Sequence, residues 1–110
     1  MGGFESSSSN LDGGLYLRGI GVNPFARLSN IKVFNDSGLG VFGTDGQIAQ
    51  KSIDHGATIS SNSWGTVGVY GIYNTRAQNY DSLTRDSGSA AGNQPLLFVF
   101  AAGNSGARVR

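Results

Sequence analysis

The chain has 110 residues, enough for one domain or part of one, and its 8 basic against 7 acidic residues give a net charge of +1. The basic residues are scattered from Arg18 to Arg110 without a run, which argues against nucleic acid or an anionic membrane surface as a partner. Cysteine is absent, so disulfides, thiolate metal sites and a cysteine nucleophile are excluded.

The N-terminal residues offer little apolar surface to bury. Residues 1–14 are mostly glycine, serine and asparagine, and we expect a flexible leader that lacks the basic and apolar regions of a secretory signal. The segment Leu28–Phe34 is β-branched and apolar in its second half, which predicts a first strand. A glycine-rich loop over residues 35–43 follows it.

A helix and a second strand come next. Thr44 and Gln47 match a capping box, which predicts a helix over Asp45–His55, and Gly56 supplies its C-terminal stop. The β-branched content of residues 57–62 predicts the second strand.

A second predicted helix and a third predicted strand follow, in the same helix-then-strand order. Apolar residues at helical spacing predict a helix over Asn74–Arg85, with Arg76 off its apolar face. The apolar run Leu96–Ala102, between Pro95 and a glycine, is typical of a strand buried on both faces.

This order predicts an α/β fold, because two strand–helix–strand units in series favour parallel pairing. We expect a three-stranded parallel sheet with flanking helices. Two helices cannot cover both faces of such a sheet completely, so exposed apolar surface or unpaired strand edges are also expected.

The loop over residues 38–43 reads Gly-Leu-Gly-Val-Phe-Gly, which is the spacing of a dinucleotide-binding fingerprint. The match is weak, because the first glycine does not follow the strand directly and the next strand ends in Ser60, Ser61, Asn62 and Ser63 without a carboxylate. We therefore predict no cofactor and interpret the segment as a strand-to-helix loop.

The most specific segment is Ala-Ala-Gly-Asn at 101–104, directly after the third predicted strand. In open parallel sheets ligands bind just beyond the carboxyl ends of the strands, so the side-chain amide of Asn104 is placed to donate to a developing oxyanion. Together with Asn-Ser-Trp-Gly at 62–65, the segment resembles the subtilisin-like serine peptidases.

The resemblance implies a partial subtilisin-like three-layer sandwich over residues 15–106, followed by a tail at 107–110. It also implies two loops that pair with an extended peptide by main-chain hydrogen bonds, with Val41 or Phe42 lining an apolar pocket and Asn104 as the catalytic oxyanion donor. The substrate-binding residues implied are Gly38, Leu39, Gly40, Ser63, Trp64, Gly65, Ala101, Ala102 and Gly103.

The family's catalytic segments are not recognisable in this sequence. Its first-strand aspartate and its His-Gly-Thr-His segment are expected before Met1, and its Gly-Thr-Ser-Met-Ala segment after Arg110. Nucleophile, base and orienting acid act as a unit, so we expect no peptidase activity from this chain alone. The family is mostly secreted, and the localisation of this chain is left open.

Two other interpretations remain. The chain could be a self-associating or peptide-binding module, most simply a homo-oligomer that covers its sheet edges and apolar strand. It could also be a weak promiscuous hydrolase in which His55 pairs with Asp54 or Asp45. A helix-terminal histidine is more often a surface residue that complements the helix dipole, and we predict no metal site.

Overall fold

The computed structural model describes residues 11–40, 42–65 and 71–104. Residues 1–10 of the predicted leader, Val41 of the predicted pocket and the whole predicted tail at 107–110 lie outside these ranges. Backbone contacts divide the chain into two units, Met1–Asn30 and Ile31–Arg110, each described by itself.

The first unit is a loop organised by Asp12. Its carboxylate accepts the backbone N–H groups of Gly14 at 2.9 Å and Tyr16 at 3.0 Å, and Leu11 forms an isolated antiparallel bridge with Leu17. Tyr16 is 75% exposed and Phe25 81%, so this unit buries few of its own large apolar side chains.

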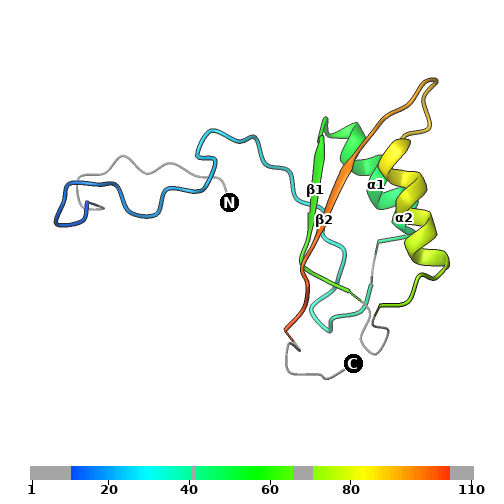
Figure 1. Ribbon diagram of the computed structural model, residues 1–110, viewed down its shortest axis with the longest axis horizontal. Coiled ribbons are helices and arrows are strands. Elements are labelled where there is room, and N and C mark those ends of the chain that lie inside the picture. Colours follow the sequence, from blue (N-terminus) through cyan, green and yellow to red (C-terminus); the bar gives the residue numbers. More distant parts are fainter. Residues whose placement is uncertain (1–10, 41, 66–70, 105–110) are drawn as a thin grey trace. The chain divides into compact units, whose positions relative to one another are not determined.

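The second unit contains, in chain order, the helix α1, the strand β1, the helix α2 and the strand β2 (Figure 1). Their bounds are Asp45–Asp54, Ile59–Asn62, Thr75–Arg85 and Leu97–Phe100. None of the helices in the described part of the chain is long and apolar enough to cross a membrane.

Helix α1 begins at the predicted capping box. The Thr44 hydroxyl accepts the Gln47 backbone N–H at 3.3 Å, and the Gln47 side chain accepts the Thr44 backbone N–H at 2.8 Å. The helix ends one residue earlier than predicted, with His55 as its C-cap and Gly56 in the left-handed conformation at φ 73°.

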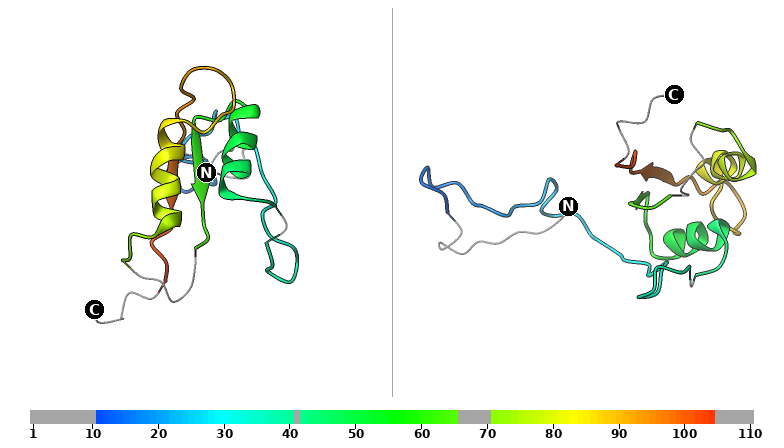
Figure 2. Two further views of the ribbon diagram at one scale, coloured as in Figure 1. Left: turned by 90° about the vertical axis from the view of Figure 1, so that its right-hand side faces the viewer. Right: turned by 90° about the horizontal axis from the view of Figure 1, so that it is seen from below.

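Helix α2 also follows its prediction closely. Asn74 is its N-cap, and the side-chain oxygen accepts the backbone N–H groups of Arg76 at 3.1 Å and Ala77 at 3.0 Å. Both helices lie on the same face of the strands (Figure 2).

The predicted three-stranded sheet is wrong for the described residues: the sheet has two parallel strands, with Ile59 opposite Leu97 and Asn62 opposite Phe100. The segment Leu28–Phe34 forms no strand, because its last residue instead makes an isolated antiparallel bridge to Gly40 within its own loop.

The core is small and lies between the helices and one face of the sheet. Among the described residues, its buried apolar side chains are Ile48, Ala49 and Leu96. Phe98 and Phe100 contact Tyr80 of α2, so the alternate residues Leu97 and Val99 face away from the helices.

The expectation that the last strand is buried on both faces is therefore wrong. Both helices cover the same face, and the other face exposes Ile59 by 58%, Leu97 by 53% and Val99 by 47%. This is the exposed apolar surface that two helices were expected to leave.

Candidate functional site

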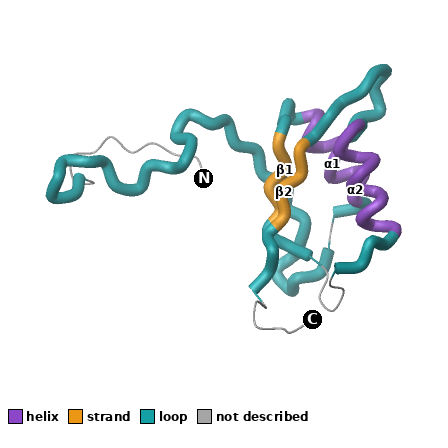
Figure 3. Tube along the Cα trace, viewed as in Figure 1, coloured by secondary structure: helices purple, strands orange, loops and turns teal. Residues whose placement is uncertain are grey.

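The carboxyl ends of β1 and β2, the N-termini of both helices and the loop before α1 lie at one end of the second unit (Figures 1 and 3). This arrangement follows from parallel strands connected by a helix, since every strand then runs toward the same edge. Backbone N–H groups at helix starts and loops beyond the strands are available there to a ligand.

The loop over residues 35–40 is held by Asn35. Its side-chain oxygen accepts the backbone N–H groups of Ser37 at 3.0 Å and Leu39 at 2.9 Å, and its own backbone N–H donates to the Leu39 carbonyl at 2.9 Å. Gly38 has φ 75°, a conformation that side chains disfavour. The result is a tight loop that exposes residues 38–40.

Beyond β2 the backbone continues alongside β1 for one more residue. The Ala101 N–H donates to the Asn62 carbonyl at 3.0 Å, and Gly103 then turns the chain with φ 88°. Residues 101–104 are exposed, so the Asn104 side chain lies at the surface beyond the carboxyl end of the strand.

Trp64, in the loop after β1, is surrounded by other rings. Its indole meets Phe34 edge to face with ring centroids 6.0 Å apart, and Phe100 in the same way at 5.7 Å. The guanidinium carbon of Arg76 lies 4.9 Å from the centroid of the indole, which is a cation–π contact. These contacts join the loop after β1 to α2, to β2 and to the loop before α1.

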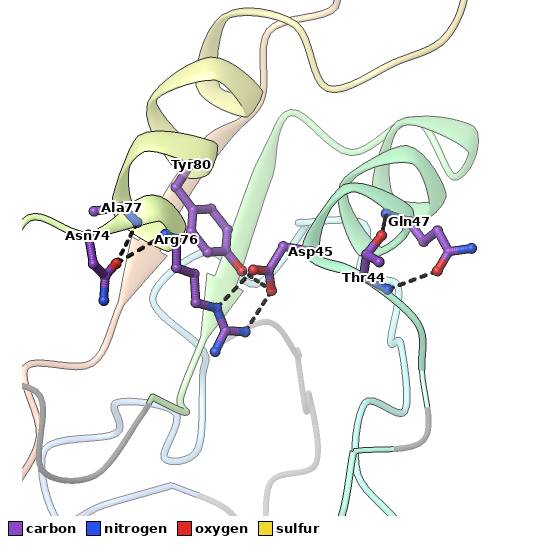
Figure 4. Close-up of polar contacts among 7 residues, drawn as sticks. All are labelled: Thr44, Asp45, Gln47, Asn74, Arg76, Ala77 and Tyr80. Atoms are coloured by element: carbon purple, nitrogen blue, oxygen red, sulfur yellow. Dashed lines mark hydrogen bonds and ion pairs between the residues drawn. The ribbon is translucent and has the colours of Figure 1, made fainter.

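Arg76 is fixed in turn by Asp45, the first residue of α1 (Figure 4). The guanidinium donates through Nε at 2.8 Å and through Nη2 at 2.6 Å to the two carboxylate oxygens, and the Tyr80 hydroxyl donates to the same carboxylate at 3.0 Å. Asp45 has a side chain only 13% exposed, whereas that of Arg76 is 44% exposed.

These contacts shift the acid–base behaviour of the group. Burial acts to raise the pKa of Asp45, but the hydrogen bonds from Arg76 and Tyr80 outweigh it, so this pKa lies below its ordinary value of 3.8. Burial and the hydrogen bond to Asp45 raise the pKa of Tyr80 to about 12. At neutral pH Asp45 and Arg76 are therefore an ion pair, and the Tyr80 phenol is neutral. None of the three changes its protonation state near pH 7, so the group is suited to a structural role and not to proton transfer.

Two open clefts meet at Trp64. The first encloses about 250 Å³, and its lining includes Phe34, Gly40, Phe42, Trp64 and Gly65. The second encloses about 220 Å³; Trp64 and Gly65 line this one too, together with Ile72, Tyr80 and Phe100. Arg76 lines both clefts.

Comparison with known families gives a match along nearly the whole chain, since the sequence model of the subtilase family, peptidase S8, covers residues 2–109. The chain belongs to the subtilase family. Neither a curated protein nor a solved structure matches it. The subtilases are serine peptidases, and the two-stranded α/β unit is compatible with part of a subtilisin-like fold.

Three of the subtilase residues predicted from the sequence line one cleft: Gly40 from the first loop and Trp64 and Gly65 from the second. Phe42, predicted for an apolar pocket, lines the same cleft. The other predicted residues do not line either of these two clefts; they are Gly38, Leu39, Ser63, Ala101, Ala102, Gly103 and Asn104.

The residue pattern does not identify Asp45 and Arg76 as partners. It predicts only that Arg76 lies off the apolar face of its helix, whereas in the structure Arg76 joins α2 to α1 and to Trp64. One signal in the sequence could have found this pair. Parallel strands joined by helices bring both helix N-termini to the same edge of the sheet, and Asp45 and Arg76 carry opposite charges in the first turns of the two helices.

Proposed function

We propose that this subtilase chain supplies the peptide-binding loops and the oxyanion asparagine of a serine endopeptidase, and that alone it binds extended peptides without hydrolysing them. Support comes from one observation above all: the two loops predicted to flank a substrate border the same cleft through Gly40, Trp64 and Gly65. The glycines leave backbone N–H and C=O groups accessible to another main chain.

The cleft chemistry favours an apolar side chain of the peptide. Phe34, Phe42 and Trp64 supply ring surface, while the backbone at Gly40 and Gly65 is exposed. Main-chain pairing would give affinity without much sequence preference, and the apolar cleft would select one side chain.

Asn104 has the role of oxyanion donor in this proposal. It follows the strand end at an exposed position, where a substrate carbonyl has access. A single such donor is worth about 3–4 kcal/mol in subtilisin, the worked example from which this magnitude is taken, and it acts only on a nucleophilic attack that other residues must supply.

Binding can be followed through Trp64, since it is the only tryptophan in the chain. We expect an uncharged extended peptide with one central leucine or phenylalanine to change its fluorescence saturably, and the same peptide to remain intact by mass spectrometry. Absence of saturable binding contradicts the proposal, and so does cleavage by the purified chain.

A matched pair of variants locates the binding. A Cβ added at Gly40 meets no atom within 4 Å, so we expect Gly40→Val to fold, as circular dichroism would establish, while its side chain obstructs the approach of a peptide. Gly13→Val adds the same side chain at another open position, in the first unit and outside both loops. Affinity should fall for Gly40→Val and stay unchanged for Gly13→Val.

Self-association is a second candidate function, favoured by the exposed apolar face of the sheet. Ile59, Leu97 and Val99 lie on the face that neither helix covers, and a net charge of +1 opposes contact between copies only weakly. Light scattering after size exclusion should give more than one chain for the parent, and Val99→Glu should shift it toward the monomer. A parent that stays monomeric over a wide concentration range contradicts this candidate.

A further inference from the structure

The indole of Trp64 stands where the two clefts meet. Both clefts have Trp64, Gly65 and Arg76 in their lining, whereas Phe42 lines only the first and Ile72 only the second. Among the described residues that line both clefts, Trp64 and Arg76 are the ones that contribute a side chain, so each of these two side chains borders both clefts.

Trp64 depends on contacts from other elements for its position. It belongs to neither β1 nor a helix, so backbone hydrogen bonds of a regular element do not fix it. Edge-to-face contacts with Phe34 and Phe100 surround the ring, and the guanidinium of Arg76 covers one of its faces.

Arg76 is suited to fix the indole because its own geometry is fixed. The two hydrogen bonds to the Asp45 carboxylate hold the planar guanidinium in one orientation. Asp45 is anchored as the first residue of α1, directly after the Thr44 cap. The position of the indole is thus coupled to the start of α1 through a chain of two contacts.

We propose that Arg76 is a positioning residue that holds the Trp64 indole as a wall between two subsites, so that a bound peptide places separate apolar side chains in the two clefts. This inference rests on the proposed peptide binding. It adds a preference for peptides with two medium-sized apolar side chains over peptides with one very large side chain, because clefts of about 250 Å³ and 220 Å³ stay separate.

The first test measures the indole without any peptide. Because Trp64 is the only tryptophan, its fluorescence anisotropy and its quenching by acrylamide report on this side chain alone. We expect Arg76→Ala to lower the anisotropy and raise the quenching. Arg76→Lys should lie between Ala and the parent, since lysine keeps the charge over the ring but not the two-point contact with Asp45.

The control is Arg85→Ala, which removes the same charge from the last turn of the same helix, outside both clefts. It should leave anisotropy and quenching at the parent values. Circular dichroism establishes that each variant is folded, and if Arg76→Ala unfolds, the comparison of Arg76→Lys with Arg85→Ala decides. An Arg76 variant that is folded and matches the parent in both measurements overturns the proposal.

The second test measures selectivity with two peptides, one with two leucines and one with a single naphthylalanine. Without the guanidinium the indole is free to move and the clefts can join, so Arg76→Ala should shift the affinity ratio toward naphthylalanine by about fivefold, the equivalent of one cation–π contact. An unchanged ratio in the presence of binding overturns the role of Arg76. If the parent binds neither peptide, the peptide-binding function itself is overturned. The anisotropy and quenching then decide only whether Arg76 positions the indole.

Discussion

Replacing Asp45 by asparagine tests the contact that joins the two helices. The carboxylate accepts two hydrogen bonds from Arg76 and one from Tyr80, and its side chain is 13% exposed. Asparagine has nearly the same shape but no charge, and its NH2 group takes the place of one acceptor oxygen, so the substitution removes the ionic part of these bonds together with one of the two hydrogen bonds from Arg76.

The expected loss follows from the exposure of the partners. Hydrogen bonds to charged groups contribute about 1.5–3 kcal/mol when buried, and solvent screening at the 44% exposed Arg76 side chain reduces the value for this pair to about 1–2 kcal/mol. The negative charge in the first turn of α1 adds about 0.5 kcal/mol. We therefore expect the free energy of unfolding to fall by about 2 kcal/mol for Asp45→Asn.

Urea unfolding followed by circular dichroism measures this loss, with Asp36→Asn as the matched control. Asp36 pairs with Lys32 at 3.3 Å but its side chain is fully exposed, so the same substitution should leave the free energy of unfolding nearly unchanged. Equal stabilities of the two variants would refute the assigned strength of the Asp45 contact.

The pH dependence gives an independent check of the same contact. Because the pKa of Asp45 in the folded chain lies below its ordinary value of 3.8, its contribution is complete above that value and is lost as the pH falls through the folded pKa. The stability difference between parent and Asp45→Asn should be constant near neutral pH and shrink in acid. A difference that does not change with acidification would contradict the ionic account.

Three further predictions concern the helix cap, the phenol and the first loop. An added Cβ at Gly43 would displace the Gln47 side-chain oxygen from the Thr44 N–H, so Gly43→Ala should lower the free energy of unfolding by about 1 kcal/mol through loss of this cap contact, whereas Gly46→Ala in the first turn should not lower it. The pKa of Tyr80 is raised from 10.0 to about 12, so an ultraviolet titration should show a phenol that titrates near pH 12 and that Tyr80→Phe removes, and the stability this phenol contributes should be lost as the pH rises from 10 toward 12. Asn35→Ala should weaken peptide binding by loosening the loop, and Asn35→Asp, which keeps the acceptor for the Ser37 and Leu39 N–H groups, should preserve it; equal binding by the two variants would contradict this role.

The sequence predicted helices well because their ends depend on neighbouring residues. The side chains of Thr44 and Gln47 each accept the backbone N–H of the other residue, three positions away. The Asn74 side chain accepts N–H groups of the turn that follows it. Such contacts are local, so residue type and spacing are enough to place them.

The prediction of a strand at Leu28–Phe34 was wrong because a strand must pair with a second segment, and residue types alone do not show which segment that is. The β-branched content indicates only that the segment would suit a pleated surface. Within this chain Asn35 closes a tight loop that brings Phe34 opposite Gly40, and the Phe34 ring packs against Trp64.

The candidate site was predictable in part. Chain order places loops 35–40 and 63–65 at one edge of a parallel sheet, so Gly40, Trp64 and Gly65 could be expected to meet. The contacts of Arg76 with Asp45 and Trp64 could not be expected, because they depend on the spacing and rotation of two helices, and Asp45 and Arg76 are 31 positions apart along the chain.

The most direct test of the peptide-binding proposal is a titration of the ¹⁵N-labelled chain with an extended leucine-containing peptide, followed through its backbone amide signals. The account predicts that the largest shifts occur at Gly38–Gly40 and at Ser63–Gly65, because both loops border the cleft where the peptide is proposed to pair. Shifts concentrated instead at Ile59, Leu97 and Val99, on the face away from the helices, or no shifts at all, would contradict it.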